Sequence, residues 1–256
     1  MKGAFDFNTA CVSHVGLTRK INEDSLLARP EIGLWAIADG MGGYGGGDVA
    51  SRAVVDALGT IAPNPSAADF LGEFEQRIMR VNADLRALSH SHDAAVIGTT
   101  LVTLMIHNDH FACVWCGDSR AYLRRRDELS RVSRDHSEVQ ELIDRGLLDE
   151  EGARIWPRRN VVTRALGATD EAELELVDGP IYTGDRFLLC SDGLTAHVRD
   201  EEIAALIAQG EPQKACDDLL HLTLDRGARD NVSIIVVDCD LGEAGAMKRP
   251  GSLSVG

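Results

Sequence analysis

The apolar positions of the chain follow two different periods, which predicts a mixture of strands and helices. Short runs rich in Val, Ile, Phe and Leu indicate strands. The predicted strands cover residues 4–14, 33–38, 174–178, 186–190 and 232–238. Longer segments with apolar residues at helical spacing indicate amphipathic helices. The predicted helices cover residues 47–61, 66–89, about 200–209 and 212–226.

The middle of the chain has a different pattern. From 99 to 132, short strands separated by turn signals predict an antiparallel meander. Residues 136–160 are polar and helical, which predicts an insertion lying over the body of the domain. Strands that cluster, with helices arriving in pairs, are typical of an α+β protein rather than of a parallel α/β sheet. We therefore predict one domain over residues 1–240, with residues 241–256 as a disordered tail.

Composition narrows the classes of protein that remain. The 256 residues are 44% hydrophobic and 26% charged, as in an ordinary folded domain. The net charge of −15 argues against broad nucleic-acid binding, which needs a basic surface. No apolar run approaches the roughly 20 residues that span a bilayer, and the N-terminus lacks the apolar core of a signal peptide. We expect a cytoplasmic protein, and a monomer.

The six cysteines do not suggest a metal site. Cys113 and Cys116 form one C-x-x-C, but no second pair or nearby histidine completes a zinc site. Residues three apart on a strand also point to opposite faces. Reduced, buried thiols are therefore expected.

Five short acidic motifs are the strongest chemical signal. Asp39, Asp118 and Asp192 each follow an apolar run that predicts a buried strand. A carboxylate at such a place is costly unless a positive group meets it. Singly, each motif is a common turn pair. Together they predict a site for a hard cation such as Mg²⁺ or Mn²⁺, which prefers oxygen ligands. The motifs are Asn22-Glu23-Asp24, Asp39-Gly40, Gly117-Asp118-Ser119, Ser191-Asp192-Gly193 and Asp230-Asn231.

Two other motifs compete with this interpretation. The loop 40–45 matches G-x-G-x-x-G between a strand and a helix, as in dinucleotide-binding folds. However, Asp39 stands where a pyrophosphate needs backbone donors, and no acidic residue ends a second strand about 20 residues later. Ser191 lies in a context that breaks the G-x-S-x-G nucleophile elbow, which favours a structural serine.

The acidic motifs occur within an ordered series that resembles the metal-dependent protein phosphatases of the PPM type, also called type 2C. The Met41 position is similar to bacterial members. The similar motifs extend from about residue 10 to residue 238. They are 16–24 (GLTRKINED), 38–43 (ADGMGG), 98–100 (GTT), 117–120 (GDSR), 135–136 (DH), 160–167 (NVVTRALG), 191–194 (SDGL) and 230–231 (DN).

The resemblance implies a β-sandwich of two antiparallel sheets flanked by helices, an α-β-β-α architecture with metals at one end and a flap at about 137–163. It implies two or three Mn²⁺ or Mg²⁺ ions per chain. Asp39 would bridge two cations, the Gly40 carbonyl would serve one, and Asp192 and Asp230 would complete the other. The remaining implied residues are Glu23 and Asp24 through water, Asp118 at a third metal, and Arg19 on the substrate phosphate.

The implied function is hydrolysis of phosphoserine and phosphothreonine in proteins, opposing a bacterial Ser/Thr kinase. Cations about 3.5–4 Å apart lower the pKa of a shared water and orient it for attack. The proton for the leaving group has no obvious source, because Met41 stands where many eukaryotic relatives have a histidine. Two donors of this proton are possible: a water near Asp118, or the side chain of His136. A catalytically silent module that binds phosphoproteins is the alternative to an enzyme.

Overall fold

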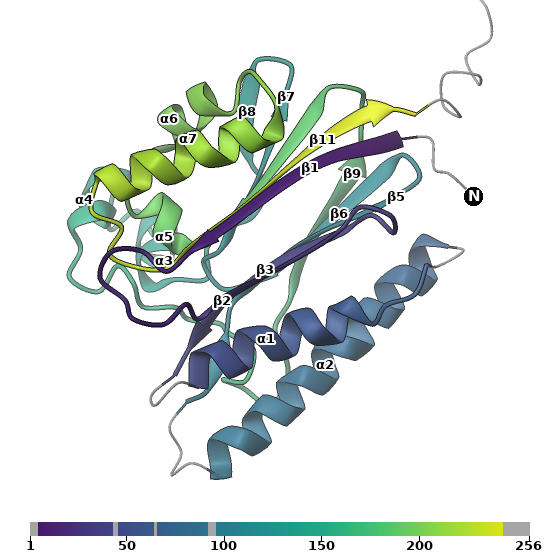
Figure 1. Cartoon of the computed structure of the whole chain (residues 1–256). Helices are drawn as coiled ribbons and strands as arrows, with labels where there is room; N and C mark the ends of the chain where they lie inside the picture. Colours follow the sequence, from purple (N-terminus) through teal and green to yellow (C-terminus); the bar gives the residue numbers. More distant parts are fainter. Residues whose placement is uncertain (1–4, 43–45, 64–65, 92–95, 243–256) are drawn as a thin grey trace, which may run out of the picture.

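The computed structural model describes residues 5–42, 46–63, 66–91 and 96–242, and its strands form two antiparallel sheets (Figure 1). The first sheet has the order β1-β11-β10-β7-β8. Its strands are β1 (Phe5–His14), β11 (Val232–Leu241), β10 (Asp185–Cys190), β7 (Arg120–Arg125) and β8 (Glu128–Arg131). The second sheet has the order β2-β3-β5-β6-β9, with the short β4 paired to β3. Its strands are β2 (Asp24–Arg29), β3 (Leu34–Met41), β4 (Gly98–Thr99), β5 (Leu101–His107), β6 (His110–Cys116) and β9 (Glu175–Pro180).

Helices cover the outer face of each sheet (Figure 1). One pair, α1 (Gly46–Gly59) and α2 (Ala67–Ser91), packs on the second sheet. On the first sheet lie α5 (Asp192–Thr195), α6 (Asp200–Leu206) and α7 (Pro212–Asp225). This arrangement confirms the predicted sandwich of two antiparallel sheets flanked by helices.

The central strands are apolar on both faces because each lies between two layers. On β3, Trp35 and Ile37 point into the space between the sheets, whereas Leu34 and Ala36 pack under α1 and α2. The alternation follows from the period of two along a strand. Burying each large apolar side chain contributes about 1.5–3 kcal/mol. The core therefore holds both sheets rigidly up to the strand ends, where the acidic motifs begin.

The structure corrects two sequence predictions. The strand β2 (Asp24–Arg29) was missed, because its short run of Leu and Ala carries little strand preference. The predicted meander is divided, since β5 and β6 belong to one sheet and β7 and β8 to the other. The chain crosses between sheets at Gly117, whose φ of +116° favours glycine. A Cβ there would lie 2.6 Å from Cβ of Thr100. This crossing brings Asp118 to the end of the sandwich.

The loop that resembles a dinucleotide-binding motif follows an antiparallel strand. β3 pairs antiparallel with both β2 and β5, whereas a dinucleotide fold requires a parallel β-α-β unit. The alternative is therefore excluded by topology. Within the motif, residues 43–45 lie outside the described part of the chain.

The predicted insertion contains two short helices, α3 (Glu138–Asp144) and α4 (Glu150–Ile155). Ser137 and Asp149 cap them by accepting the backbone N–H groups of Gln140 and Gly152. The base of the insertion is closed where Glu138 N–H donates to Val161 O at 2.9 Å. We call residues 137–163 the flap.

All six cysteines are free thiols, and Cys113 and Cys116 face different layers as expected. Cys11 is exposed, because it lies on the edge strand β1. No helix in the described residues is both long and apolar enough to cross a bilayer. The last strand continues to Leu241, and residues 243–256 of the predicted tail lie outside the described residues.

Candidate metal centre at one end of the sandwich

The predicted carboxylates come from strand ends that meet at one end of the two sheets. Asp24 and Asp39 are paired across β2 and β3. Asp118 lies in the crossing between β6 and β7, Asp192 follows β10, and Asp230 precedes β11. Burial, and then the charges of Asp24, Asp192, Asp118 and Asp230, hold the pKa of Asp39 well above its usual value. The structure thus brings together residues that are up to 206 positions apart (230 minus 24).

Hydroxyl groups fix the strand end that carries Asp39. Its N–H donates to Thr100 Oγ1 at 3.1 Å, and its carbonyl accepts from Thr99 Oγ1 at 2.9 Å. Thr100 Oγ1 also lies 2.8 Å from Ser119 Oγ, the residue after Asp118. The two threonines therefore connect the backbone positions of two candidate ligands.

Ser191 orients Asp24 and does not resemble a nucleophile. Its Oγ donates to Asp24 Oδ2 at 2.8 Å and accepts the N–H of Ser233 at 2.9 Å. The other carboxylate oxygen, Oδ1 of Asp24, is buried and has no hydrogen-bond partner among the described residues. Such an unpaired buried oxygen is costly, and a cation or a water bound to it would remove that cost.

Asn231 holds the loop between β1 and β2 against the start of β11. Its Oδ1 accepts the Glu23 N–H at 2.8 Å, and its Nδ2 donates to the carbonyls of Val15 and Ile21 at 2.9 and 3.0 Å. Sequence analysis noted Asn231 only as part of a turn motif and missed this role. The sequence does offer one signal for this role: Asn231 directly follows the candidate ligand Asp230, and its amide can donate two hydrogen bonds and accept others.

Close backbone packing explains the glycine after Asp39. A Cβ on Gly40 would lie 1.9 Å from Gly47 O and 2.7 Å from Glu23 O. Gly40 N–H donates to Glu23 O at 3.0 Å. The glycine therefore lets β3, the start of α1 and the Glu23 loop meet at one point.

Burial and mutual repulsion raise the pKa values of these carboxyl groups. Burial is the main cause for Asp24, whose pKa rises to about 7 with further effect from Asp192 and Asp230. The pKa of Asp192 rises to about 6, chiefly by burial and then by Asp230, while the charge of Arg19 opposes the rise. Burial first, and Asp192 second, hold the pKa of Asp118 well above its usual value. The pKa of Glu23 is raised by burial as well.

Arg19 reaches this end of the sandwich from the loop between β1 and β2. Its Nη2 lies 2.7 Å from Asp230 Oδ2, and the side chains of Arg19 and Asp230 are 51% and 35% exposed. Within the described residues, no three Asp, Glu, His or Cys side chains enclose a metal ion as they stand. In this structure Asp230 is engaged with Arg19 instead.

His136 is buried behind the segment that carries Asp118, with both ring nitrogens engaged. Nδ1 accepts the Gly117 N–H at 3.1 Å, and Nε2 lies 3.2 Å from Glu175 Oε1. The ring stacks against Trp115, with 6.2 Å between centroids. These contacts favour a structural role, in which His136 supports the crossing beside Asp118.

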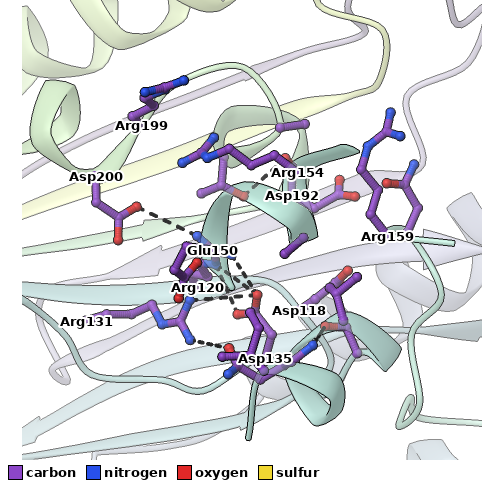
Figure 2. A pocket seen from close by; sticks show the side chains of 18 of the residues that line it. Asp118, Arg120, Arg131, Asp135, Glu150, Arg154, Arg159, Asp192, Arg199 and Asp200 are labelled. Carbon is purple, nitrogen blue, oxygen red and sulfur yellow. Dashed lines mark hydrogen bonds and ion pairs between the residues drawn. The ribbon is translucent and has the colours of Figure 1, made fainter. Parts of the chain in front are cut away.

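A cavity of about 650 Å³ extends from the carboxylates to the flap (Figure 2). Asp118 and Asp192 line it at the metal end, and Arg154, Arg159 and Arg199 line it on the flap and α6. Its size lies within the range of ligand-binding pockets. The arrangement therefore combines an acidic centre with an adjoining space large enough for part of a substrate.

Comparison with known proteins defines the class to which this fold and site belong. The model of the family described as Protein phosphatase 2C matches residues 18–216, and the chain belongs to that family. The chain is 37% identical over 238 residues to the serine/threonine protein phosphatase PstP of Mycobacterium tuberculosis. That match covers 91% of this chain and 46% of PstP, so the chain spans about half the length of this relative.

Two solved structures are closely similar to the whole fold. PppA, a key regulatory component of T6SS in Pseudomonas aeruginosa, is 40% identical with a TM-score of 0.85, covering 91% of this chain and 97% of PppA. The catalytic domain of PstP in complex with 2 manganese ions is 34% identical with a TM-score of 0.84, covering 92% and 99% of the two chains.

Proposed function

We propose that this chain is a metal-dependent protein phosphatase that hydrolyses phosphoserine and phosphothreonine in proteins. One observation carries the proposal: carboxylates from five separate segments converge at one end of the sandwich, where burial and repulsion raise their pKa values. Such a cluster is unfavourable unless cations join it. Membership of the type 2C family and the manganese in the PstP structure support the same assignment.

The residues present fit two or three Mn²⁺ or Mg²⁺ ions, whose preferred ligands are oxygens. In this assignment Asp39 would be shared by two ions, the Gly40 carbonyl would serve one, and Asp192 with Asp230 would complete the other. Asp118 would join Asp192 at a third position, and Glu23 and Asp24 would hold bound waters. The unpaired Oδ1 of Asp24 supports its place in this set. Bound metal lowers the pKa of a shared water, which supplies the nucleophile.

Arg19 binds the phosphoryl group of the substrate. Its guanidinium is exposed, lies at the edge of the carboxylate cluster, and already pairs with an anionic group there. A planar guanidinium can donate to two phosphate oxygens at once, whereas a lysine supplies a point charge. If Asp230 held a cation instead, Arg19 would be free for this contact.

The leaving alkoxide needs a proton, and we assign its source to the part of the site near Asp118. Met41 has no proton to donate, and both nitrogens of His136 are engaged with Gly117 and Glu175. A water held by Asp118 remains as the donor. Of the two candidates that the sequence offers, the engaged nitrogens of His136 favour the water.

Hydrolysis of a chromogenic aryl phosphate tests the enzymatic function directly. We expect turnover with Mn²⁺ that disappears with a chelator and returns when Mn²⁺ is added in excess. If the protein has no activity with any divalent metal but still binds phosphoproteins, it is a silent binding module and the proposal fails.

The biological setting follows from the same chemistry. We propose phosphoprotein substrates, a cognate bacterial Ser/Thr kinase whose action the chain opposes, and a monomeric cytoplasmic protein, consistent with its six free thiols. The similarity to PppA makes a secretion apparatus one candidate pathway. Phosphoproteomics of a deletion strain tests these points: sites whose phosphorylation rises are candidate substrates, and no change would contradict the proposal.

A further inference from the structure

The cavity beside the candidate metal centre has Asp118 and Asp192 at one end, and at its rim both arginines and acidic residues (Figure 2). We call the end with the two aspartates the acidic floor, and the proposed function places the phosphoryl group there. The rim is formed by α4 and the segment after it, in the flap, and by Arg199 at the start of α6. In the described residues, five arginines line this cavity: Arg120, Arg131, Arg154, Arg159 and Arg199.

Two of these arginines are already neutralised within the protein. Arg120 makes a bidentate contact with Asp135, at 3.0 Å from Nε and 2.7 Å from Nη2, and is largely buried. Arg131 donates to Gln140 Oε1 at 2.7 Å and lies 3.9 Å from the same Asp135. These two side chains therefore stabilise the wall of the cavity and leave little charge for a ligand.

The other three arginines keep most of their hydrogen-bonding capacity. Arg154 and Arg159 are exposed and have no ion pair among the described residues. Arg199 reaches Glu151 only at 3.9 Å, and both side chains are exposed, at 57% and 73%. An ion pair of that length between exposed groups is worth little. Three guanidinium groups thus face one cavity with donors to spare.

Four acidic residues also line the rim of the cavity: Glu150, Glu151, Asp200 and Glu201. Glu151 has the 3.9 Å contact with Arg199, whereas Glu150, one helical turn from Arg154 on α4, forms no ion pair with it in the described part of the chain. Asp200 accepts from Tyr122 OH at 3.0 Å and lies 3.7 Å from Arg120. Glu201 is on the exposed first turn of α6. The rim therefore remains able to bind an added carboxylate, because guanidinium forks match its two oxygens.

We propose that Arg154, Arg159 and Arg199 form an acid-binding rim, which selects phosphoproteins with an aspartate or glutamate close to the phosphorylated residue. This inference rests on the proposed phosphatase function, since that function fixes where the phosphoryl group lies. With the phosphoryl group at the acidic floor, the neighbouring residues of the substrate pass the rim. An acidic neighbour then gains charged hydrogen bonds that a neutral one lacks.

Paired phosphopeptides test this specificity. Each pair has the same sequence except that Asp and Glu beside the phosphothreonine are replaced by Asn and Gln, on the N-terminal side in one pair and on the C-terminal side in another. With Mn²⁺ at low salt, we expect kcat/KM to favour the acidic peptide of one pair by about threefold to tenfold, as expected for a few solvent-screened ion pairs. The preference should shrink in about 0.5 M NaCl.

Substitutions in the rim separate this role from a general effect of charge. Arg154→Gln, Arg159→Gln and Arg199→Gln should each lower the ratio of kcat/KM between acidic and neutral peptides, and the triple variant should bring it close to one. Arg154→Lys should keep part of the preference, because it retains the charge but not the fork. The matched control is Arg145→Gln, a flap arginine that is 69% exposed and outside the cavity lining. It makes the same change in net charge and should leave the ratio at the wild-type value.

The outcomes distinguish this inference from the function on which it rests. If the protein hydrolyses aryl phosphate but acts on acidic and neutral peptides at equal rates, the acid-binding role of the rim is wrong and the proposed phosphatase function stands. A loss of preference in Arg145→Gln equal to that in the rim variants would also overturn the role of the rim, since the effect would then come from the overall field. Failure to hydrolyse any phosphate ester with any metal would remove both proposals together.

Discussion

The two ends of strand β10 carry buried acidic residues in opposite electrostatic settings. Asp185 at the start of the strand is 2% exposed and receives two hydrogen bonds from Arg125, at 2.9 and 2.8 Å. The N–H of Tyr182 also donates to Asp185, at 2.8 Å. Asp192, just beyond the other end, has Asp230 as the neighbouring charge that most raises its pKa. One carboxylate has its own cation built into the chain, and the other stands among like charges.

The difference separates structural carboxylates from those suited to an external cation. A buried charge is tolerated when a partner and hydrogen bonds offset its loss of hydration. Asp135 follows the same rule as Asp185, because Arg120 holds it. In the cluster around Asp39, several buried carboxylates lie close together without such a partner, which is typical of a functional site. The following predictions test whether that division holds.

The largest effect is expected when a carboxylate of the cluster is replaced. Asp192→Asn should reduce turnover by more than about 100-fold, because changing a residue that only hydrogen-bonds to a metal ligand already costs about 10–100-fold. The metal-free fold should be retained, since the change removes one of several repelling charges. Steady-state kinetics with saturating Mn²⁺ and a thermal melt in chelator measure the two quantities. Near wild-type turnover would mean that the metal assignment is wrong.

The second effect is a pH-dependent stability that metal reverses. The pKa of Asp24 is about 7 and that of Asp192 about 6 in the folded protein, against an ordinary value of 3.8. The folded state therefore binds these protons more tightly than the unfolded state does. Their stabilising contribution is full below about pH 4 and is lost as the pH rises through 6 to 7.

Thermal melts in chelator, between pH 5 and pH 8, check this sign. We expect the contribution of the cluster to lower Tm on the order of 5 °C across that range, a shift that corresponds to about 1–2.5 kcal/mol in a domain of this size. Mn²⁺ should raise Tm most at the upper end of the range. The Asp192→Asn variant serves as the control and should show a smaller pH dependence. A rise of wild-type Tm with pH that the variant reproduces would contradict the prediction.

The third prediction concerns the opposite end of β10. Asp185→Asn leaves Arg125, whose side chain is 35% exposed, without its counter-charge. This should cost about 2–3 kcal/mol of unfolding free energy, at or below the 3–5 kcal/mol expected for a fully buried pair. Chemical denaturation measures the loss, and Asp178→Asn on the exposed part of β9 is the matched control. Turnover per folded molecule should be kept. A large loss of turnover without a loss of stability would erase the distinction between the two ends.

The sequence predicted the candidate metal-binding carboxylates better than the structural carboxylate at the other end of β10. Asp39, Asp118 and Asp192 could be identified because a carboxylate after an apolar strand is unusual, and their shared motif order pointed to one family. Asp185 drew no attention, although it too borders a strand, because its partner Arg125 is 60 residues away. Long-range pairing of this kind has no local signal.

The same limit applies within the site. Asn231 and Thr100 hold the ligand-bearing segments by hydrogen bonds across 208 and 61 residues, to Glu23 and Asp39. Their side chains are ordinary in composition, so only the folded structure reveals what they bind. The strand at Asp24 was missed for a related reason, since its place in the sheet depends on pairing with β3 rather than on its own residues.

The smallest effect is expected at Arg19, whose setting contrasts with that of Arg125. Arg125 is 35% exposed and held by a buried partner, whereas Arg19 is 51% exposed and meets a half-exposed Asp230. Arg19 can therefore exchange one anion for another at little cost.

Arg19→Ala should raise KM for a phosphoprotein through the loss of a charged hydrogen bond worth about 1.5–3 kcal/mol. Mn²⁺ affinity should not fall, because the substitution removes a competitor for Asp230. Kinetics and calorimetric metal titration of this variant, with Lys20→Ala as the neighbouring control, separate the two effects. An unchanged KM would remove Arg19 from the site, and weaker metal binding would mean that its contact with Asp230 supports the metal centre.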